Sequence, residues 1–241
     1  MDDVFTDIAI STKMSTHKTV LRLVGCCLET QVPILVYESI EKETLYCRIL
    51  GSTFNRPPRQ RMSWQSKLKV AREISHAIAY LHNAFSRPIV HRCIDLENIL
   101  FTEHDVPKFS GFSLFITIPE GETRLEDPTL HGSYWFMCPN YRATTQITNK
   151  SDVYSFGVLL LLMLLTELLT NDEIQGIEDC NIVKYVRKHS INDIVDPTIM
   201  VGEGAAVLDL ALACTRDNSE DRPTMVNVTK ELKRIVRLVQ P

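Results

Sequence analysis

The chain has 241 residues, enough for one large domain or two small lobes with a substantial buried core. Its net charge of −4 provides no basic surface for nucleic acid, and its 44% hydrophobic content is ordinary for a soluble globular protein. Seven cysteines without C-x-x-C or Cys/His spacing favour reduced thiols in a cytosolic setting over a zinc site.

The first third of the chain combines a short mixed segment with β-rich runs. Residues 5–16 predict a weakly amphipathic helix. Residues 20–27 and 33–38 are rich in β-branched and apolar residues, and their short separation predicts a hairpin. A short helix is expected to start at residues 43–46, and residues 51–61, which include two prolines, predict a surface loop.

Helical patterns dominate the rest of the chain. Ser63 is a favourable N-cap, and the apolar spacing after it predicts a long amphipathic helix to residue 82. An apolar run ends at Leu165 and is too short for a bilayer, which takes about 20 residues. It therefore predicts a buried helix and no direct membrane insertion. The remaining expected elements are short strands at 88–90 and 99–101, an irregular stretch at 112–139, and helices over 152–169, 207–215 and 224–238.

Residues 90–100 follow the H-R-D-L-x-x-x-N frame of a protein-kinase catalytic loop. Cys93 stands where that frame has its catalytic aspartate. A thiol does not reproduce a fixed carboxylate base, and losing such a base typically costs about 10²–10⁴ in rate. Asp95 stands at the usual lysine position, where its charge would repel ATP phosphates. The residues of the frame that are kept are His91, Arg92 and Asn98.

The metal-binding motif is altered in the same way. Residues 108–113 lie where a kinase has D-F-G, and Gly111 replaces the aspartate before Phe112. Asn98 alone is a poor Mg²⁺ site, because Mg²⁺ prefers carboxylates together with phosphate. Neither a G-x-G-x-x-G loop nor a V-A-I-K strand occurs in the sequence. We therefore expect no catalytic residues, no metal and no cofactor, and we expect Cys93 to be a small buried side chain in preference to a reactive thiol.

Further segments resemble plant receptor-like kinase domains, in the right order and over nearly the whole chain: 23–30, 35–38, 79–82, 132–141, 151–158 and 221–225. The resemblance implies an α+β, protein-kinase-like fold with a truncated N-lobe, in which strands 1 to 3 are missing, and a mainly helical C-lobe. It implies a partial N-lobe over residues 1–40, with the C helix, strands 4 and 5 and the hinge. The C-lobe would cover residues 41–241.

Residues 7–12, together with the altered loops, are most similar to the ZED-related kinase family, plant receptor-like cytoplasmic pseudokinases. Members of that family act as adaptors for a coiled-coil NLR immune receptor. The resemblance thus implies an inactive adaptor or decoy that binds an NLR and either receptor-like cytoplasmic kinases or pathogen effectors. It also implies a cytoplasmic location, with recruitment to the plasma membrane by partners, and no nucleic-acid partner.

The resemblance gives the retained residues structural roles. His91 and Phe112 would belong to the stacked spine that joins the lobes, and Asp152 would accept hydrogen bonds from catalytic-loop amides. Arg222 would pair with Asn140, which stands where the family has a glutamate. Because removing one partner of a buried ion pair can cost ~3–5 kcal/mol, a mobile activation segment or a compensating acid is expected.

Other family positions carry weaker expectations. The C-helix glutamate falls on Ile8, or on Asp7 with one inserted residue. Arg92 is a candidate for capturing an added phosphate, since guanidinium binds such groups bidentately, and a loop-bonded arginine is the alternative. The degenerate nucleotide-binding hinge falls on Tyr37, Glu38 and Ser39. The hydroxyls of the activation segment that could be modified are Thr117, Thr123, Thr129 and Ser133.

Two alternatives remain open at this point. One is a serine/threonine kinase with an atypical ATP site. The other is a truncated product with no independent function, whose exposed strand edges would require a partner or reduce solubility.

Overall fold

The computed structural model describes residues 2–40, 43–50, 62–166, 171–177, 181–190, 203–237 and the single residues 193, 195 and 199. The predicted surface loop at 51–61 lies outside these residues. For Asp7 the structure describes the backbone, and the side chain lies outside the description.

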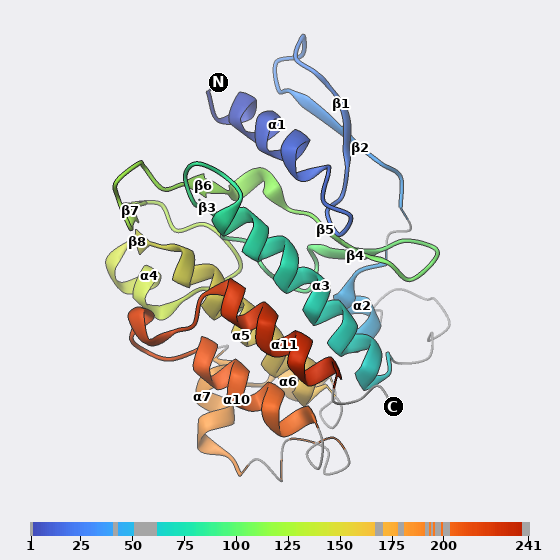
Figure 1. Ribbon diagram of the computed structural model, residues 1–241, viewed down its shortest axis with the longest axis vertical. Coiled ribbons are helices and arrows are strands. Elements are labelled where there is room, and N and C mark those ends of the chain that lie inside the picture. Colours follow the sequence, from blue (N-terminus) through green and yellow to red (C-terminus); the bar gives the residue numbers. More distant parts are fainter. Residues whose placement is uncertain are drawn as a thin grey trace.

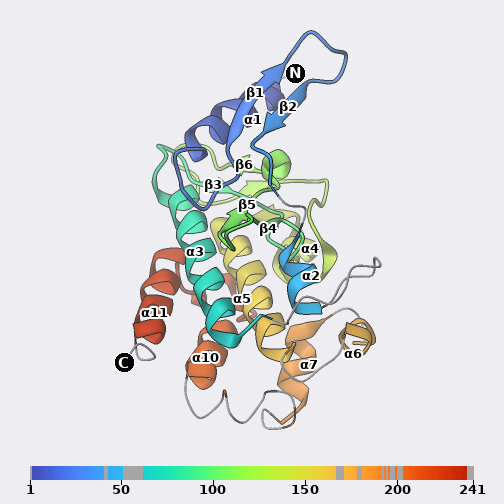
Figure 2. The same ribbon diagram turned by 90° about the vertical axis from the view of Figure 1, so that its right-hand side faces the viewer.

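The N-terminal part consists of α1 (Asp2–Met14) and an antiparallel hairpin of β1 (Leu23–Cys27) and β2 (Ile34–Tyr37). The predicted hairpin is confirmed, with Cys26 opposite Leu35. Figures 1 and 2 show α1, β1 and β2 at one end of the molecule, beyond the helical body. Both strands present apolar side chains to solvent, including Val24 and Val36.

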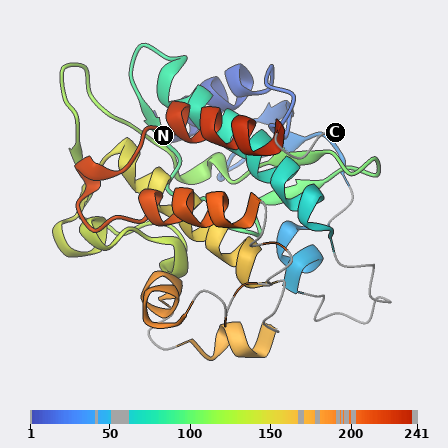
Figure 3. The same cartoon turned by 60° about the horizontal axis from the view of Figure 1, so that its bottom comes forward.

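The helical body is arranged around a buried central helix, α5 (Asn149–Leu165), whose side chains from Ser151 onward are all buried. This confirms the helix predicted from the apolar run. The predicted N-cap of α3 (Trp64–Asn83) is also present, since Ser63 accepts a hydrogen bond of 3.2 Å from the Ser66 amide. Figure 3 shows α11 (Met225–Arg237) along α3 and α10 (Ala205–Cys214) along α5. These helices bury the apolar faces that the sequence predicts.

Short elements connect the long helices and carry the loops of interest. The bounds are α2 Leu45–Leu50, β3 Ile89–Val90, β4 Ile99–Phe101, β5 Pro107–Phe109, η1 Phe112–Leu114, β6 Ile116–Thr117, β7 Leu125–Glu126, η2 Tyr134–Phe136, α4 Pro139–Thr144, β8 Gln146–Ile147, α6 Asn171–Gln175, α7 Ile182–Lys188 and η5 Ser219–Asp221. Antiparallel pairs join β3 to β6, β4 to β5, and β7 to β8. The stretch predicted to be irregular thus contains two short strands, β6 and β7, and two 3-10 turns, η1 and η2.

Among the helices of the described residues, none has the length and apolar character required to cross a bilayer.

Candidate functional site

The catalytic-loop frame is fixed to the central helix by Asp152, a fully buried residue of α5. Its Oδ2 accepts hydrogen bonds from the His91 amide at 2.8 Å and from His82 Nε2 at 2.9 Å. Its Oδ1 accepts from the Arg92 amide at 3.0 Å. The structure therefore has the amide bonds that the sequence predicts for Asp152, and His82 is a third donor that the sequence analysis missed. These bonds hold Arg92 in a left-handed conformation, with φ of 65°.

An aromatic stack lies beside this loop. The His91 ring is stacked on Phe109 at 4.3 Å between centroids and meets Phe112 edge-on at 4.9 Å. Burial lowers the pKa of His91 to about 4, so the imidazole is neutral at physiological pH. His91 and Phe112 are in contact as expected. Phe109 also belongs to this stack, and the sequence analysis did not predict it, because a bulky residue at the end of a short strand does not by itself indicate such a contact.

The thiol of Cys93 occupies the position of the catalytic base. It lies 3.6 Å from Asp95 Oδ2 and 3.2 Å from Asn98 Nδ2. Burial, reinforced by the charge of Asp95, raises the pKa of Cys93 to about 11. The thiol is therefore protonated at neutral pH and is a poor acceptor for a proton from an alcohol.

Asp95 is bonded to the main chain of the loop. Its Oδ1 accepts hydrogen bonds from the amides of Glu97 at 3.0 Å and Asn98 at 2.9 Å, which close the turn of the loop. Burial raises the pKa of Asp95 even though these amide bonds act in the opposite direction. The carboxylate is therefore used to shape the loop.

At the position of the metal ligands the chain has the Asn98 amide and Gly111. Asn98 Nδ2 donates to the Cys93 carbonyl at 3.0 Å, so the amide is turned towards the loop. A Cβ added at Gly111 would lie 2.6 Å from both Cγ and Oδ1 of Asn98, and Gly111 has φ of 82°, which favours glycine. An aspartate side chain would fit there only if the Asn98 amide moved. The residues present at this position do not fit a Mg²⁺–nucleotide complex, which needs carboxylate ligands.

The hinge position is held by a small charge cluster. Glu38 lies 2.9 Å from Lys108 Nζ and accepts a bond of 3.1 Å from the Arg22 amide. Burial tends to raise the pKa of Glu38, but the hydrogen bonds from Lys108 and the Arg22 amide outweigh it and lower that pKa. Tyr37 ends β2 and Ser39 is exposed. The ion pair with Lys108 joins Glu38 to β5.

Arg92 is already engaged within the protein. Its guanidinium pairs with Asp127 and donates to the carbonyl oxygens of Leu114 and Phe115. The loop-bonded interpretation of Arg92 therefore describes this structure, and its guanidinium does not face open solvent as a phosphate receptor would.

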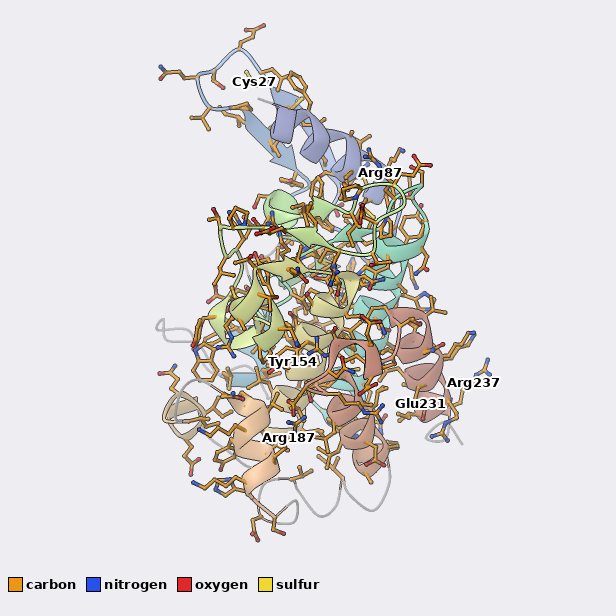
Figure 4. All side chains as sticks on the ribbon, turned by 90° about the vertical axis from the view of Figure 1, so that its left-hand side faces the viewer. Cys27, Arg87, Tyr154, Arg187, Glu231 and Arg237 are labelled. Atoms are coloured by element: carbon orange, nitrogen blue, oxygen red, sulfur yellow. The ribbon has the colours of Figure 1, made fainter. Side chains whose placement is uncertain are left out.

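Arg222 is satisfied without an acid among the described residues. Its Nη2 donates to Asn140 Oδ1 at 2.6 Å, and its Nη1 lies 3.0 Å from Cys138 Sγ. The other donors bind main-chain carbonyls of Lys150, Arg216 and Asp217. The compensating acid that the sequence suggested is thus replaced by carbonyls and a thiol. Figure 4 shows Tyr154 within the helical body, and its ring centroid lies 5.1 Å from the Arg222 guanidinium.

Comparison with known proteins identifies the fold. The family described as protein tyrosine and serine/threonine kinase matches residues 1–232. The chain belongs to the protein kinase family. The kinase-like fold expected from the motifs is thereby confirmed.

Within this family, named relatives from Arabidopsis thaliana match nearly the whole chain. The chain is 33% identical to the serine/threonine-protein kinase ZRK1, over 97% of this chain and 69% of the relative. It is 34% identical to the non-functional pseudokinase ZRK2, over 98% and 68%. It is 36% identical to the non-functional pseudokinase ZED1, over 98% and 74%. The expected placement among the ZED-related kinases is confirmed, and the names of these kinase-family relatives include both kinases and pseudokinases.

The pKa of Cys93 predicts slow alkylation. At pH 8 about one thiol in a thousand would be ionised, because the pKa lies about three units higher. We expect the rate of iodoacetamide modification at Cys93 to rise about tenfold per pH unit from pH 7 to pH 10, as the thiolate fraction does. Peptide mass spectrometry measures this, with the exposed Cys26 as the internal comparison. Cys93 is half-buried, whereas the sequence analysis expected a buried side chain. Modification of Cys93 as fast as that of Cys26 at pH 7 would contradict the raised pKa of this thiol.

Proposed function

We propose that this protein is a catalytically inactive kinase-family member that acts by binding other proteins, as an adaptor or decoy in plant innate immune signalling. The observation that carries the inactivity is the contact at residue 111. A Cβ added at Gly111, where kinases have a metal-binding aspartate, would lie only 2.6 Å from Cγ and Oδ1 of Asn98. A second support is the protonated thiol of Cys93 at the base position.

Two losses in one site act on different steps of phosphoryl transfer. In an active kinase, an aspartate at the position of residue 111 holds the metal ions that neutralise the phosphate charge. A second aspartate, at the position of residue 93, accepts the proton of the attacking hydroxyl. The acid nearest the position of the base is Asp95, whose Oδ2 lies 3.6 Å from the Cys93 thiol. Its other oxygen, Oδ1, is bonded to the amides of Glu97 and Asn98, which fix the side chain in the loop. The names of ZRK2 and ZED1 as non-functional pseudokinases support the same proposal.

The proposed partners are a plant coiled-coil NLR receptor on one face, and a receptor-like cytoplasmic kinase or a pathogen effector on another. This part of the proposal rests on membership of the ZED-related kinases. Co-expression with candidate NLR receptors, followed by size-exclusion chromatography, tests it. A stable complex with a coiled-coil NLR is expected. Separate elution from every receptor of the same plant would contradict the adaptor function.

A second candidate is a serine/threonine kinase with an atypical site, and the name of the relative ZRK1 favours it. Nucleotide binding distinguishes the two. A ligand at a hundred times its Kd stabilises a protein by about 2.7 kcal/mol. That would raise the Tm of a chain of this size by about 5–10 °C.

We expect Mg²⁺–ATP at millimolar concentration to leave the Tm unchanged, because residue 111 offers no carboxylate and the Asn98 amide is bonded to Cys93. We also expect no transfer of radiolabelled γ-phosphate to a generic protein substrate. A purified active kinase in the same assay is the positive control. Transfer that disappears in an Asn98→Ala variant would establish the atypical kinase instead.

A further inference from the structure

The activation segment of this protein is tied to the catalytic loop by an ion pair between Asp127 and Arg92. Both side chains are largely buried, with 10% and 9% of their surface exposed. The two residues are 35 positions apart in sequence, and Asp127 lies just after β7. The main chain of Asp127 is fixed as well, since its amide donates to the Thr145 carbonyl at 2.8 Å. The backbone that carries the carboxylate is therefore bonded to Thr145, the residue before β8.

A second layer of hydrogen bonds surrounds the Asp127 carboxylate. The Tyr141 hydroxyl, from α4, donates to Asp127 Oδ2 at 2.5 Å and lies 3.2 Å from the Thr129 carbonyl. The amide of His131 donates to the same hydroxyl at 3.1 Å, and His131 Nδ1 lies 3.3 Å from Asp127 Oδ2. Residues 127–131 thus fold around one carboxylate.

The backbone confirms how close the two segments are. Gly132 has φ of 110°, and a Cβ there would lie 2.2 Å from the Arg92 carbonyl oxygen. Only glycine permits this approach of the activation segment to the catalytic loop. The contact between the two segments therefore depends both on the glycine at residue 132 and on the buried Arg92–Asp127 pair.

In kinases that are switched by phosphorylation, an added phosphate orders the activation loop by pairing with arginine. We propose that Asp127 performs this function here, so that the activation segment is held against the catalytic loop without any phosphorylation. Thr129, two residues further on, is exposed, and its carbonyl belongs to the same network. A phosphate on Thr129 finds the Arg92 guanidinium already occupied. The activation segment therefore keeps one conformation and is not switched by phosphorylation. This holds whether or not the chain binds nucleotide.

Hydrogen exchange on the full chain, made in bacteria and treated with phosphatase, tests this proposal. We expect peptides covering residues 125–141 to be protected in the unmodified protein. In Asp127→Asn, exchange in these peptides should be faster by about tenfold or more, because one partner of a buried charge pair is lost. The matched control is Glu126→Gln, which removes the same charge from the exposed neighbouring residue and should leave the rates unchanged.

Two further variants keep the test decisive if Asp127→Asn unfolds. Tyr141→Phe removes only the hydroxyl that joins Asp127 to Thr129, and it should increase exchange in the same peptides by a smaller factor. Thr129→Glu should add no protection, because Arg92 is already paired. Free exchange of the segment in the unmodified protein, equal rates for Asp127→Asn and Glu126→Gln, or extra protection in Thr129→Glu would each overturn the proposal.

Discussion

Replacing Asp152 with alanine should lower the free energy of unfolding by about 3–5 kcal/mol. The carboxylate is fully buried and accepts hydrogen bonds from two catalytic-loop amides and from His82. Alanine would leave these three donors without partners, and each buried unsatisfied donor costs roughly 1–3 kcal/mol. Urea unfolding followed by circular dichroism measures the change.

The control for this variant is Asp209→Ala, at an exposed position of α10, the helix that packs on α5. A surface substitution of this kind should stay within about 0.5 kcal/mol of the parent protein. If Asp152→Ala cost no more than Asp209→Ala, the loop amides would have found other acceptors, and the proposed fixing of the loop to α5 would be wrong.

Returning an aspartate to residue 111 should destabilise the protein and restore no activity. Gly111 has a positive φ, which costs a side-chain-bearing residue of order 1–3 kcal/mol. The new Cβ would also lie 2.6 Å from Cγ of Asn98, so the Asn98 amide would have to leave Cys93. We expect Gly111→Asp to lower the free energy of unfolding by about 2–4 kcal/mol. The double variant Cys93→Asp/Gly111→Asp should still transfer no γ-phosphate.

Gly121→Asp separates the two causes of this loss. Gly121 has nearly the same φ, 81°, but nothing lies within 4 Å of its added Cβ. It therefore measures the backbone cost without the contact with Asn98. Adding Asn98→Ala to Gly111→Asp should recover the difference between the two glycine sites. Equal losses at Gly111 and Gly121 would show that the Asn98 contact is unimportant.

The sequence predicted the helices and the hairpin whose formation depends on the spacing of nearby apolar residues. The helices α3 and α5 follow from apolar spacing and a capping serine, since burying one face of a helix requires that periodicity. The hairpin β1–β2 follows from two short β-rich runs close in sequence. The strands of the activation segment were missed because two-residue strands carry no periodic signal.

The loss of the two kinase carboxylates could be read from the sequence, because Cys93 and Gly111 stand at their positions. The contacts that the neighbouring side chains make instead depend on how the chain folds. Arg92 pairs with Asp127, which is distant from it in sequence. Arg222 donates to main-chain carbonyls, and the Asn98 amide is turned towards Cys93. Local sequence patterns predict none of these partners. The physical reason is that a buried polar group must find a partner, and which partner lies within reach depends on the packing of the whole fold.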